Sequence, residues 1–484
     1  MSMTPDSARY FSENAGRWDA LRAGYFGDAV REAAIRRAYL RPEMVVADVG
    51  AGTGLLSAGL APRAARVHVI DGSEAMLAIA RQNLSAFANL TFHTAEGTSL
   101  PLPDESVDAV FANMFLHHLP DPLAAIQEMV RILRPGGRVV ITDLDAHPYA
   151  WLKDEMADVW QGFERSQVLG WFEQAGLVNR YVTCTGADCC AETSNPALTD
   201  EQGRSAEISV FVAAAAKRVP HMAAAVTANY AGLAEGASCG CGSSADAGCC
   251  GENALSAGSS CCGSEPAPVI DLRGYRPEEL AAVPAEAAEF SFGCGNPTAL
   301  AALQPGQSVL DIGSGGGIDC FLAAQRVGPA GRVIGVDVTP AMIERARASA
   351  ERNGLGWVEF RHGQAEALPV DDNSVDVVLS NCVINLTDDK GRVFAEIYRV
   401  LKPGGRLEVS DVVAGGAFLP ATIAANGARW AGCEVGALPE QEYLDLIAQA
   451  GFAPAQVRTR VAAGQADGVR LFSLTVSAEK KDFT

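Results

Sequence analysis

The chain has 484 residues, enough for two or three domains that each bury a hydrophobic core of their own. Its formal net charge of −20 argues against nucleic acid as a main partner, because phosphate binding needs a basic face. No apolar stretch reaches the ~20 residues that span a bilayer, and the polar first residues lack the apolar centre of a signal peptide. We therefore expect a cytoplasmic protein without a membrane partner.

Residues 1–218 are expected to form a first α/β domain. A helical lead-in (7–22) precedes VVADVGAGTG (45–54), which predicts a buried strand followed by a glycine-rich turn. The segment EISVFVAAAAK (207–217) is expected to be the last strand of this domain.

Residues 219–268 are expected to separate two domains. An Ala-rich helix is predicted over 221–235, and residues 236–268 are rich in Gly, Ser, Ala and Cys, which is typical of a flexible linker. Six of the 13 cysteines of the chain lie in this linker, in the close pairs Cys239 and Cys241, Cys249 and Cys250, and Cys261 and Cys262. In a large chain without an export signal, such thiols favour soft-ion chemistry over structural disulfides. Zinc or copper storage stays open as a use for them.

Residues 269–484 repeat the first domain. SVLDIGSGGG (308–317) answers to VVADVGAGTG, and the two copies keep a constant offset of 268 residues from Ser106 and Ser374 to Asp143 and Asp411. In both copies strand-like and helix-like runs alternate, which predicts a mostly parallel sheet covered by helices on both faces. Ligands of such sheets bind beyond the carboxyl ends of the strands, where the strand order switches. The fold class expected is α/β, with two tandem Rossmann-like domains.

The glycine-rich turns indicate a ligand that approaches the backbone at a helix N-terminus. The second strand of each copy ends in an acid, Asp71 or Asp337, which can accept both hydrogen bonds of a ribose diol. The loops are not G-x-G-x-x-G and contain no G-K-[ST], which disfavours a pyrophosphate or a nucleoside triphosphate.

Together with the E-x-x-R-[VI]-L-[RK]-P-G-G segment of each copy, these features resemble class I S-adenosylmethionine-dependent methyltransferases. The resemblance implies cofactor contacts in the second copy at Asp311, Gly313, Gly315 and Asp337, with Gln364 and Ala365 beside the adenine and Asn381 near the methionine moiety. The corresponding residues of the first copy are Asp48, Gly50, Gly52 and Asp71.

The second copy carries widely separated single cysteines, Cys294 in FGCGNP, Cys382 in SNCVINL and Cys433 in WAGCEVG. Zinc usually takes a C-x-x-C pair and a fourth ligand, which these three lack. Their surroundings resemble arsenite methyltransferases, and this resemblance implies that the three thiolates bind trivalent arsenic. A fourth family cysteine has its nearest candidates in Cys261 and Cys262, which are expected to help capture the metalloid. Cys320 is interpreted as a core residue.

The first copy has Met114 where the second has Cys382. His117 and His118 follow it and could act as bases on the substrate side. This copy resembles small-molecule methyltransferases of the quinone-methylating kind, and Cys184, Cys189 and Cys190 could form a second thiol cluster. Methylation, cofactor-dependent regulation and an interface role all stay open for it.

The sequence thus predicts S-adenosylmethionine-dependent methylation of trivalent arsenic by the second copy, with thioredoxin or glutathione as the reductant. Within the same class, the alternative is a small-molecule C-methyltransferase in which the cysteines are structural. From another class, the alternative is a metalloid-binding buffer or sensor without catalysis.

Overall fold

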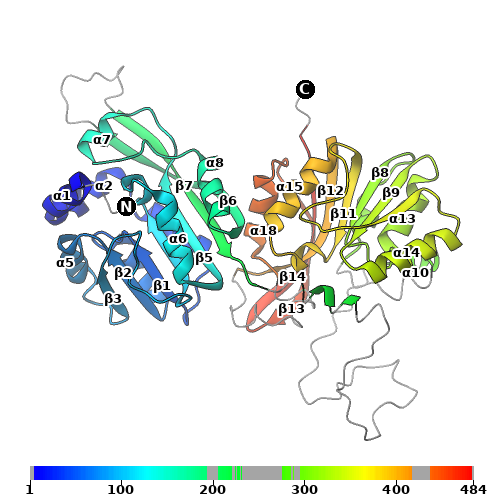
Figure 1. Cartoon of the computed structure of the whole chain (residues 1–484), viewed down its shortest axis with the longest axis horizontal. Helices are drawn as coiled ribbons and strands as arrows, with labels where there is room; N and C mark the ends of the chain where they lie inside the picture. The colour runs from blue at the N-terminus through cyan, green and yellow to red at the C-terminus, as the bar shows by residue number, and fades with distance from the viewer. Residues whose placement is uncertain are drawn as a thin grey trace, which may run out of the picture. The chain divides into compact units, whose positions relative to one another are not determined.

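The computed structural model describes residues 5–192, 205–220, 275–284, 295–416 and 436–481, and in addition 224, 226–228, 230, 231 and 287. The chain divides into two compact units, Met1–Pro220 (unit 1) and His221–Thr484 (unit 2), drawn in Figure 1. Among the described residues, no helix has the length and apolar character that crossing a membrane requires. The predicted linker, 236–268, lies outside the described residues, and the described residues within 221–235 are helical.

Unit 1 is built on a seven-stranded sheet of order β3-β2-β1-β4-β5-β7-β6. Its strands are β1 (Val45–Val49), β2 (Arg66–Asp71), β3 (Leu90–Thr94), β4 (Val107–Asn113), β5 (Leu133–Leu144), β6 (Leu177–Glu192) and β7 (Ser205–Lys217). The helices are α1 (Pro5–Asn14), α2 (Trp18–Tyr25), α3 (Asp28–Ala38), α4 (Leu55–Leu60), α5 (Glu74–Asn83), α6 (Pro122–Ile132), α7 (Trp151–Glu155) and α8 (Arg165–Gln174), with 3₁₀ turns η1 (Ala15–Arg17), η2 (Ala61–Arg63) and η3 (Leu116–His118).

Unit 2 repeats this plan in a second seven-stranded sheet, of order β10-β9-β8-β11-β12-β14-β13. Its strands are β8 (Ser308–Ile312), β9 (Arg332–Asp337), β10 (Val358–His362), β11 (Val375–Asn381), β12 (Leu401–Ala414), β13 (Gln456–Ala466) and β14 (Val469–Glu479). The described helices are α10 (Pro277–Ala281), α12 (Pro297–Leu300), α13 (Ile318–Val327), α14 (Pro340–Arg352), α15 (Lys390–Val400) and α18 (Glu440–Gln449), with the 3₁₀ turn η5 (Ile384–Leu386). The predicted fold class, two tandem Rossmann-like α/β domains, is confirmed.

Burial explains why the central strands read as nearly continuous apolar runs. In β1 and β8 the four residues after the first are all buried, as expected for parallel strands that helices cover on both faces. The last two strands of each unit, β6 and β7 or β13 and β14, run antiparallel to their neighbours. They complete each sheet at one edge beyond β5 or β12.

The segments LRPGG and LKPGG each begin a strand. β5 starts at Leu133 and β12 at Leu401, and both pairings contain a register shift just after their first residue pair. Such an irregularity tolerates a proline, which cannot donate to the ladder. A Cβ at Gly405 would lie 2.8 Å from the carbonyl oxygen of Lys402, so the turn before the regular strand needs a glycine there.

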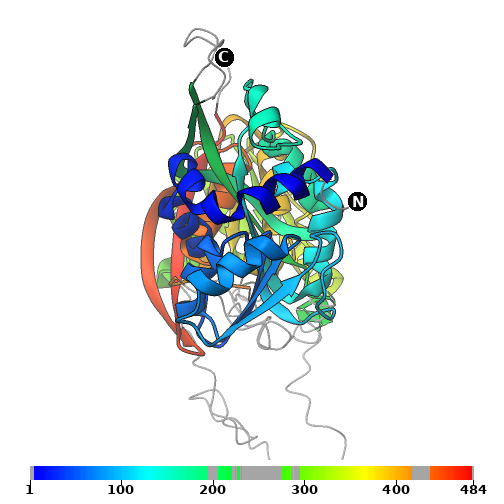
Figure 2. The ribbon, with the colours of Figure 1, turned by 90° about the vertical axis from the view of Figure 1, so that its left-hand side faces the viewer.

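The strand order creates the same crevice in both units. β1 pairs with β2 on one side and β4 on the other, and β8 pairs likewise with β9 and β11. The connections that follow these central strands therefore diverge, which leaves room for a ligand at the carboxyl ends of the strands. In unit 1, Phe11 of helix α1 and Ala15 of the turn η1 form a buried cluster with Met76 of α5, and both helices face the viewer in Figure 2.

Candidate active sites

The glycine loop after the first strand has the same backbone shape in both units. Gly50 and Gly52 in unit 1, and Gly313 and Gly315 in unit 2, have positive φ angles between 49° and 72°. A Cβ at Gly50 would overlap the Phe115 ring, and one at Gly313 would overlap the Val383 side chain. These glycines are therefore required both by conformation and by the close approach of the residue that follows Met114 or Cys382.

The acid that ends the second strand is held in one orientation by the glycine loop. In unit 1 the Asp71 carboxylate accepts the N–H of Gly52 at 2.8 Å and that of Ser73 at 2.8 Å. Asp337 accepts the N–H groups of Gly315 at 2.9 Å and Thr339 at 2.8 Å. Burial raises the pKa of both carboxyls, and the backbone N–H groups oppose that rise. Each oxygen keeps a lone pair that a diol could use.

The acid of the first strand lies beneath each loop and receives one side-chain donor. The Ser57 hydroxyl donates to Asp48 at 2.6 Å, and the Cys320 thiol occupies the matching place, 3.3 Å from Asp311. Burial raises the pKa of Asp48 to about 7, and that of Asp311 well above its ordinary value. Cys320 is fully buried, as predicted, and the structure adds a role as the donor to Asp311.

The remaining predicted contacts of the second unit lie near Asp337 and at the end of β11. The N–H of Gly363 donates to the Asp337 carbonyl at 3.0 Å, which brings the turn that contains Gln364 and buried Ala365 next to that acid. Asn381 is the last residue of β11, and β11 pairs with β8.

In unit 1 these elements line a pocket. Its walls come from the glycine loop, the end of β2, the end of β4 and the N-terminal helices, and they include Asp48, Gly50, Gly52, Asp71, Glu96, Asn113, Met114, His118, Phe11 and Trp18. All four predicted cofactor residues of this unit therefore face one cavity.

Asn381 joins the end of β11 to the segment that follows Cys294. Its side-chain oxygen accepts the N–H of Gly295 at 3.2 Å, and its amide nitrogen donates to the Gly295 carbonyl at 2.9 Å. Cys294 itself lies outside the described residues. Gly295 directly follows Cys294 in the chain, and Asn381 directly precedes Cys382. The hydrogen bonds therefore join the chain neighbours of the two predicted ligands.

Cys382 occupies a backbone position that both units share. Its φ angle is 60° and that of Met114 is 52°, so the residue that follows the strand has a positive φ angle in both units. The N–H of each donates to the next strand, to Ser410 and Thr142 respectively, at 2.8 Å. The Cys382 side chain is buried and takes part in a disulfide bond.

Cys433 lies outside the described residues, but the chain that follows it reaches the same place. Gly436 is packed so closely on the backbone of Asn385 that a Cβ there would overlap the Asn385 carbonyl. Ala437 belongs to one buried cluster with Cys382. The linker cysteines, Cys261 and Cys262 among them, also lie outside the described residues.

Comparisons with known proteins agree with this geometry. Residues 47–141 and residues 303–451 match two families that are each described as a methyltransferase domain. Both units contain methyltransferase domains.

Among curated relatives, the arsenite methyltransferase of Halobacterium salinarum is 42% identical over 269 residues, which are 53% of this chain and 66% of that protein. The arsenite methyltransferase of Aquipseudomonas alcaligenes is 50% identical over 130 residues, 25% of this chain and 37% of the relative. The solved structure of an arsenic(III) S-adenosylmethionine methyltransferase from Chlamydomonas reinhardtii is 36% identical, covers 42% of this chain and 73% of that one, and has a TM-score of 0.39. The chain thus spans just under two thirds, or less, of the length of these curated relatives.

The second methyltransferase domain holds a buried polar group that sequence reasoning missed. Asp319 accepts the Tyr275 hydroxyl at 2.6 Å, the Thr298 hydroxyl at 2.5 Å and the Asn381 amide at 3.2 Å. Burial and the neighbouring Asp319 raise the pKa of Tyr275 well above its ordinary value. This network fixes the rotamer with which Asn381 holds Gly295. No local pattern reveals it, because its four members come from four separate segments of the chain.

The same domain also contains a buried cation and anion. Lys390 is 1% exposed and donates to the carbonyls of Asn385 at 3.2 Å and Thr387 at 3.0 Å. Asp411, which interacts electrostatically with Lys390, is fully buried and accepts the Tyr443 hydroxyl at 3.1 Å. Burial raises the pKa of Asp411, and the charge of Lys390 opposes that rise.

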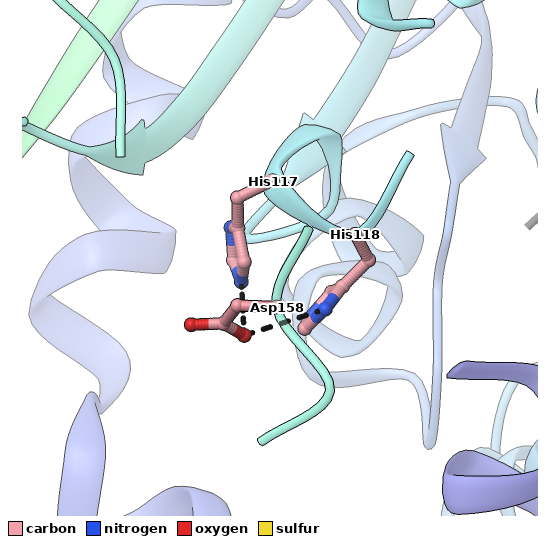
Figure 3. A group of neighbouring side chains, drawn as sticks. All are labelled: His117, His118 and Asp158. Atoms are coloured by element: carbon pink, nitrogen blue, oxygen red, sulfur yellow. Dashed lines mark ion pairs between the residues drawn. The ribbon is translucent and has the colours of Figure 1, made fainter. Parts of the chain in front are cut away.

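In the first methyltransferase domain, the two predicted histidines are buried beside two acids. His117 contacts Asp143 through Nδ1 at 2.6 Å, and His118 lines the pocket. Asp158, which sequence reasoning also missed, lies 3.6 Å from His117 Nε2 and 3.5 Å from His118 Nδ1 (Figure 3). Burial lowers the pKa of His117, but the two carboxylates raise it to about 9, whereas burial keeps that of His118 well below its ordinary value.

The cysteines of β6 do not share one environment. Cys184 is exposed and accepts a hydrogen bond from Arg165 at 3.2 Å, whereas Cys189 is buried, and neither forms a disulfide. The side chain of Cys190 lies outside the described residues. A thiol cluster in this domain therefore stays a prediction.

Proposed function

We propose that the second methyltransferase domain transfers a methyl group from S-adenosylmethionine to trivalent arsenic held by Cys294, Cys382 and Cys433. The observation that carries this proposal is that two distant segments of the chain, at Gly295 and at Ala437, come close to the end of β11, where Cys382 lies. Gly295, next to Cys294, is bonded to Asn381, and Ala437 shares a buried cluster with Cys382. Cys433 precedes Gly436 by three positions, which span at most about 10 Å, and this short spacing supports a site that includes its thiol.

The chemistry of the three thiols favours arsenic. Thiolates are soft ligands, and three of them bind As(III) in a pyramid that leaves its lone pair free. The lone pair forms the arsenic–carbon bond as the carbon–sulfur bond of the sulfonium breaks, and the electron pair of that bond stays on the departing thioether. No general base is needed, so the domain has only to align donor and acceptor and exclude water.

Methyl transfer oxidises arsenic by two electrons, and the cysteine trio can return them by forming a disulfide. The disulfide at Cys382 is consistent with this oxidised state. Thioredoxin or glutathione would then restore the thiols by exchange.

Cofactor binding is assigned to Asp311, Gly313, Gly315 and Asp337, with Gln364 and Ala365 beside the adenine and Asn381 near the methionine moiety. The Asp337 carboxylate, oriented by the Gly315 and Thr339 N–H groups, would accept the ribose hydroxyls. Asp48, Gly50, Gly52 and Asp71 would hold a second cofactor molecule, since the pocket of the first domain joins them. Cys261 and Cys262 would deliver arsenic to the trio.

The test is incubation of the full chain with labelled S-adenosylmethionine, As(III) and thioredoxin or glutathione, followed by separation of the arsenic species. Wild type should give methylated arsenic, and Cys382→Ser should give none while its titration with S-adenosylmethionine stays unchanged. Cys184→Ser, at an exposed cysteine of the other unit, is the matched control and should keep full activity.

Other outcomes assign the protein differently. Tight As(III) binding without methylated product would indicate a buffer or sensor. Full activity of Cys382→Ser would contradict the thiolate site and favour an organic substrate.

A further inference from the structure

Unit 1 buries more polar side chains around its two histidines than the shared fold requires. Both units bury an acid at the same place, Asp143 in unit 1 and Asp411 in unit 2. Asp143 is fully satisfied by the N–H groups of Leu116 at 3.0 Å and Leu144 at 2.8 Å and by His117 at 2.6 Å. A second buried carboxylate and a second buried imidazole add nothing to that arrangement.

Asp158 is the surplus acid. Its side chain is 4% exposed, and one oxygen, Oδ1, faces both His117 Nε2 at 3.6 Å and His118 Nδ1 at 3.5 Å, as Figure 3 shows. These separations exceed a hydrogen bond. Within the described part of the chain, Asp158 receives these two contacts and no hydrogen bond. A buried carboxylate normally has closer partners than these.

The separations match the edges of a coordination polyhedron. Zinc binds imidazole nitrogen and carboxylate oxygen at about 2.0–2.2 Å, so two ligands of a tetrahedral ion lie about 3.4 Å apart. The three ligand atoms lie within 4.8 Å of one another, and all three residues are buried. Among the described residues, they form the group of His, Cys, Asp and Glu side chains whose spacing suits an ion.

We propose that His117, His118 and Asp158 bind a divalent transition-metal ion of the Zn²⁺ class in the first methyltransferase domain. His117 would bind through Nε2, because its Nδ1 is occupied by Asp143. The Asp143 contact sets the tautomer and ring orientation of His117, which is the usual relation between a ligating histidine and an outer carboxylate. Two imidazoles and one carboxylate leave a fourth position open.

The position of the proposed ion indicates that it would act on a molecule bound in the pocket. His118 lines the pocket that also contains Gly52 and Asp71, so the ion would lie at the wall of the cofactor pocket. An ion there can bind a hydroxyl or amine of an organic substrate and lower the pKa of that group. This inference concerns unit 1 and does not depend on arsenic methylation by unit 2.

The experiment measures zinc bound to the full, reduced chain after equilibration with Zn²⁺ and dialysis, by elemental analysis. Because cysteine thiols can also bind zinc, the readout is the difference in zinc content between variants. Asp158→Asn removes the ligand and keeps the shape, and it should lower the zinc content by one equivalent per chain. His93→Gln is the matched control, since His93 pairs with His68 on neighbouring strands outside the cluster, and it should bind as much zinc as wild type.

A second measurement distinguishes the ligands. With Co²⁺ as the probe, the wild-type spectrum minus that of Asp158→Asn should show d–d bands without a thiolate charge-transfer band. His118→Asn should give the same difference, and it replaces Asp158→Asn if circular dichroism shows that this variant is unfolded. Equal zinc content in wild type and the folded variants, or a thiolate band in the difference spectrum, would overturn the proposal and leave the cluster as a buried ion-pair network.

Discussion

The side-chain amide of Asn381 accepts the N–H of Gly295 through its oxygen and donates to the Gly295 carbonyl through its nitrogen, so the last residue of β11 fixes the backbone at Gly295. The two residues are 86 positions apart in the chain. Gly295 also lies so close to Ser410 that an added Cβ would be 2.6 Å from its hydroxyl oxygen and 2.7 Å from its Cβ. The contact therefore requires a glycine at position 295, directly after the first predicted arsenic ligand in the chain.

The first prediction concerns this contact. Gly295→Ala should displace the segment that bears Cys294 and lower arsenic methylation by at least about tenfold, which corresponds to about 1.4 kcal/mol. Titration with S-adenosylmethionine should change little, because the glycine loop is untouched. The double variant Gly295→Ala, Ser410→Gly removes the obstructing side chain and should recover part of the activity. Equal loss in both variants would argue that the segment does not position the thiol.

The second prediction counts cofactor sites. Asp71→Asn and Asp337→Asn each remove one negative charge from a carboxylate proposed to bind ribose, and each should weaken cofactor binding at the affected site by about 1.5–3 kcal/mol. Isothermal titration of wild type with S-adenosylmethionine should give two sites per chain, and each variant should lose tight binding at one of them. One site in wild type that is insensitive to Asp71→Asn would show that unit 1 binds no cofactor.

The third prediction concerns the buried pair of unit 2. Lys390→Met leaves the buried Asp411 carboxylate without a cation and should lower the free energy of unfolding by about 3–5 kcal/mol. Adding Asp411→Asn removes the uncompensated charge and should restore most of that loss. Chemical denaturation of wild type, Lys390→Met, Asp411→Asn and the double variant completes the double-mutant cycle. Additive losses would mean that the two groups do not interact.

The fourth prediction is a pH dependence at Asp48. Burial raises its pKa in the folded chain to about 7, from an ordinary value of 3.8, so the folded state binds more protons than the unfolded state within that window. The contribution of Asp48 to stability therefore falls as pH rises through the window, by roughly 4 kcal/mol in total. Asp48→Asn cannot titrate, and its stability relative to wild type should rise from pH 4 to pH 7.5.

The measurement for Asp48 is urea denaturation of the cofactor-free chain at several pH values. Asp145→Asn is the control, since the partly buried Asp145 is paired with Arg165 at 2.7 Å. A difference between Asp48→Asn and wild type that does not vary with pH would contradict the raised pKa.

The sequence by itself determined the duplication, the two α/β domains and the glycine loops. These features follow from local patterns: apolar runs of strand length, glycines at fixed offsets, and an acid such as Asp71 or Asp337 at a strand end. The backbone conformation that such patterns require is decided within a few residues, so it can be read without knowing the strand order.

The tertiary structure alone decided which distant groups meet. Asn381 reaches Gly295, Cys320 takes the place of Ser57 beneath the loop, and Asp158 joins His117 and His118. Each of these relations depends on the strand order and on how the connections cross the carboxyl ends of the strands. No local pattern specifies them, because a side chain gives no sign in sequence of the partner that folding brings to it.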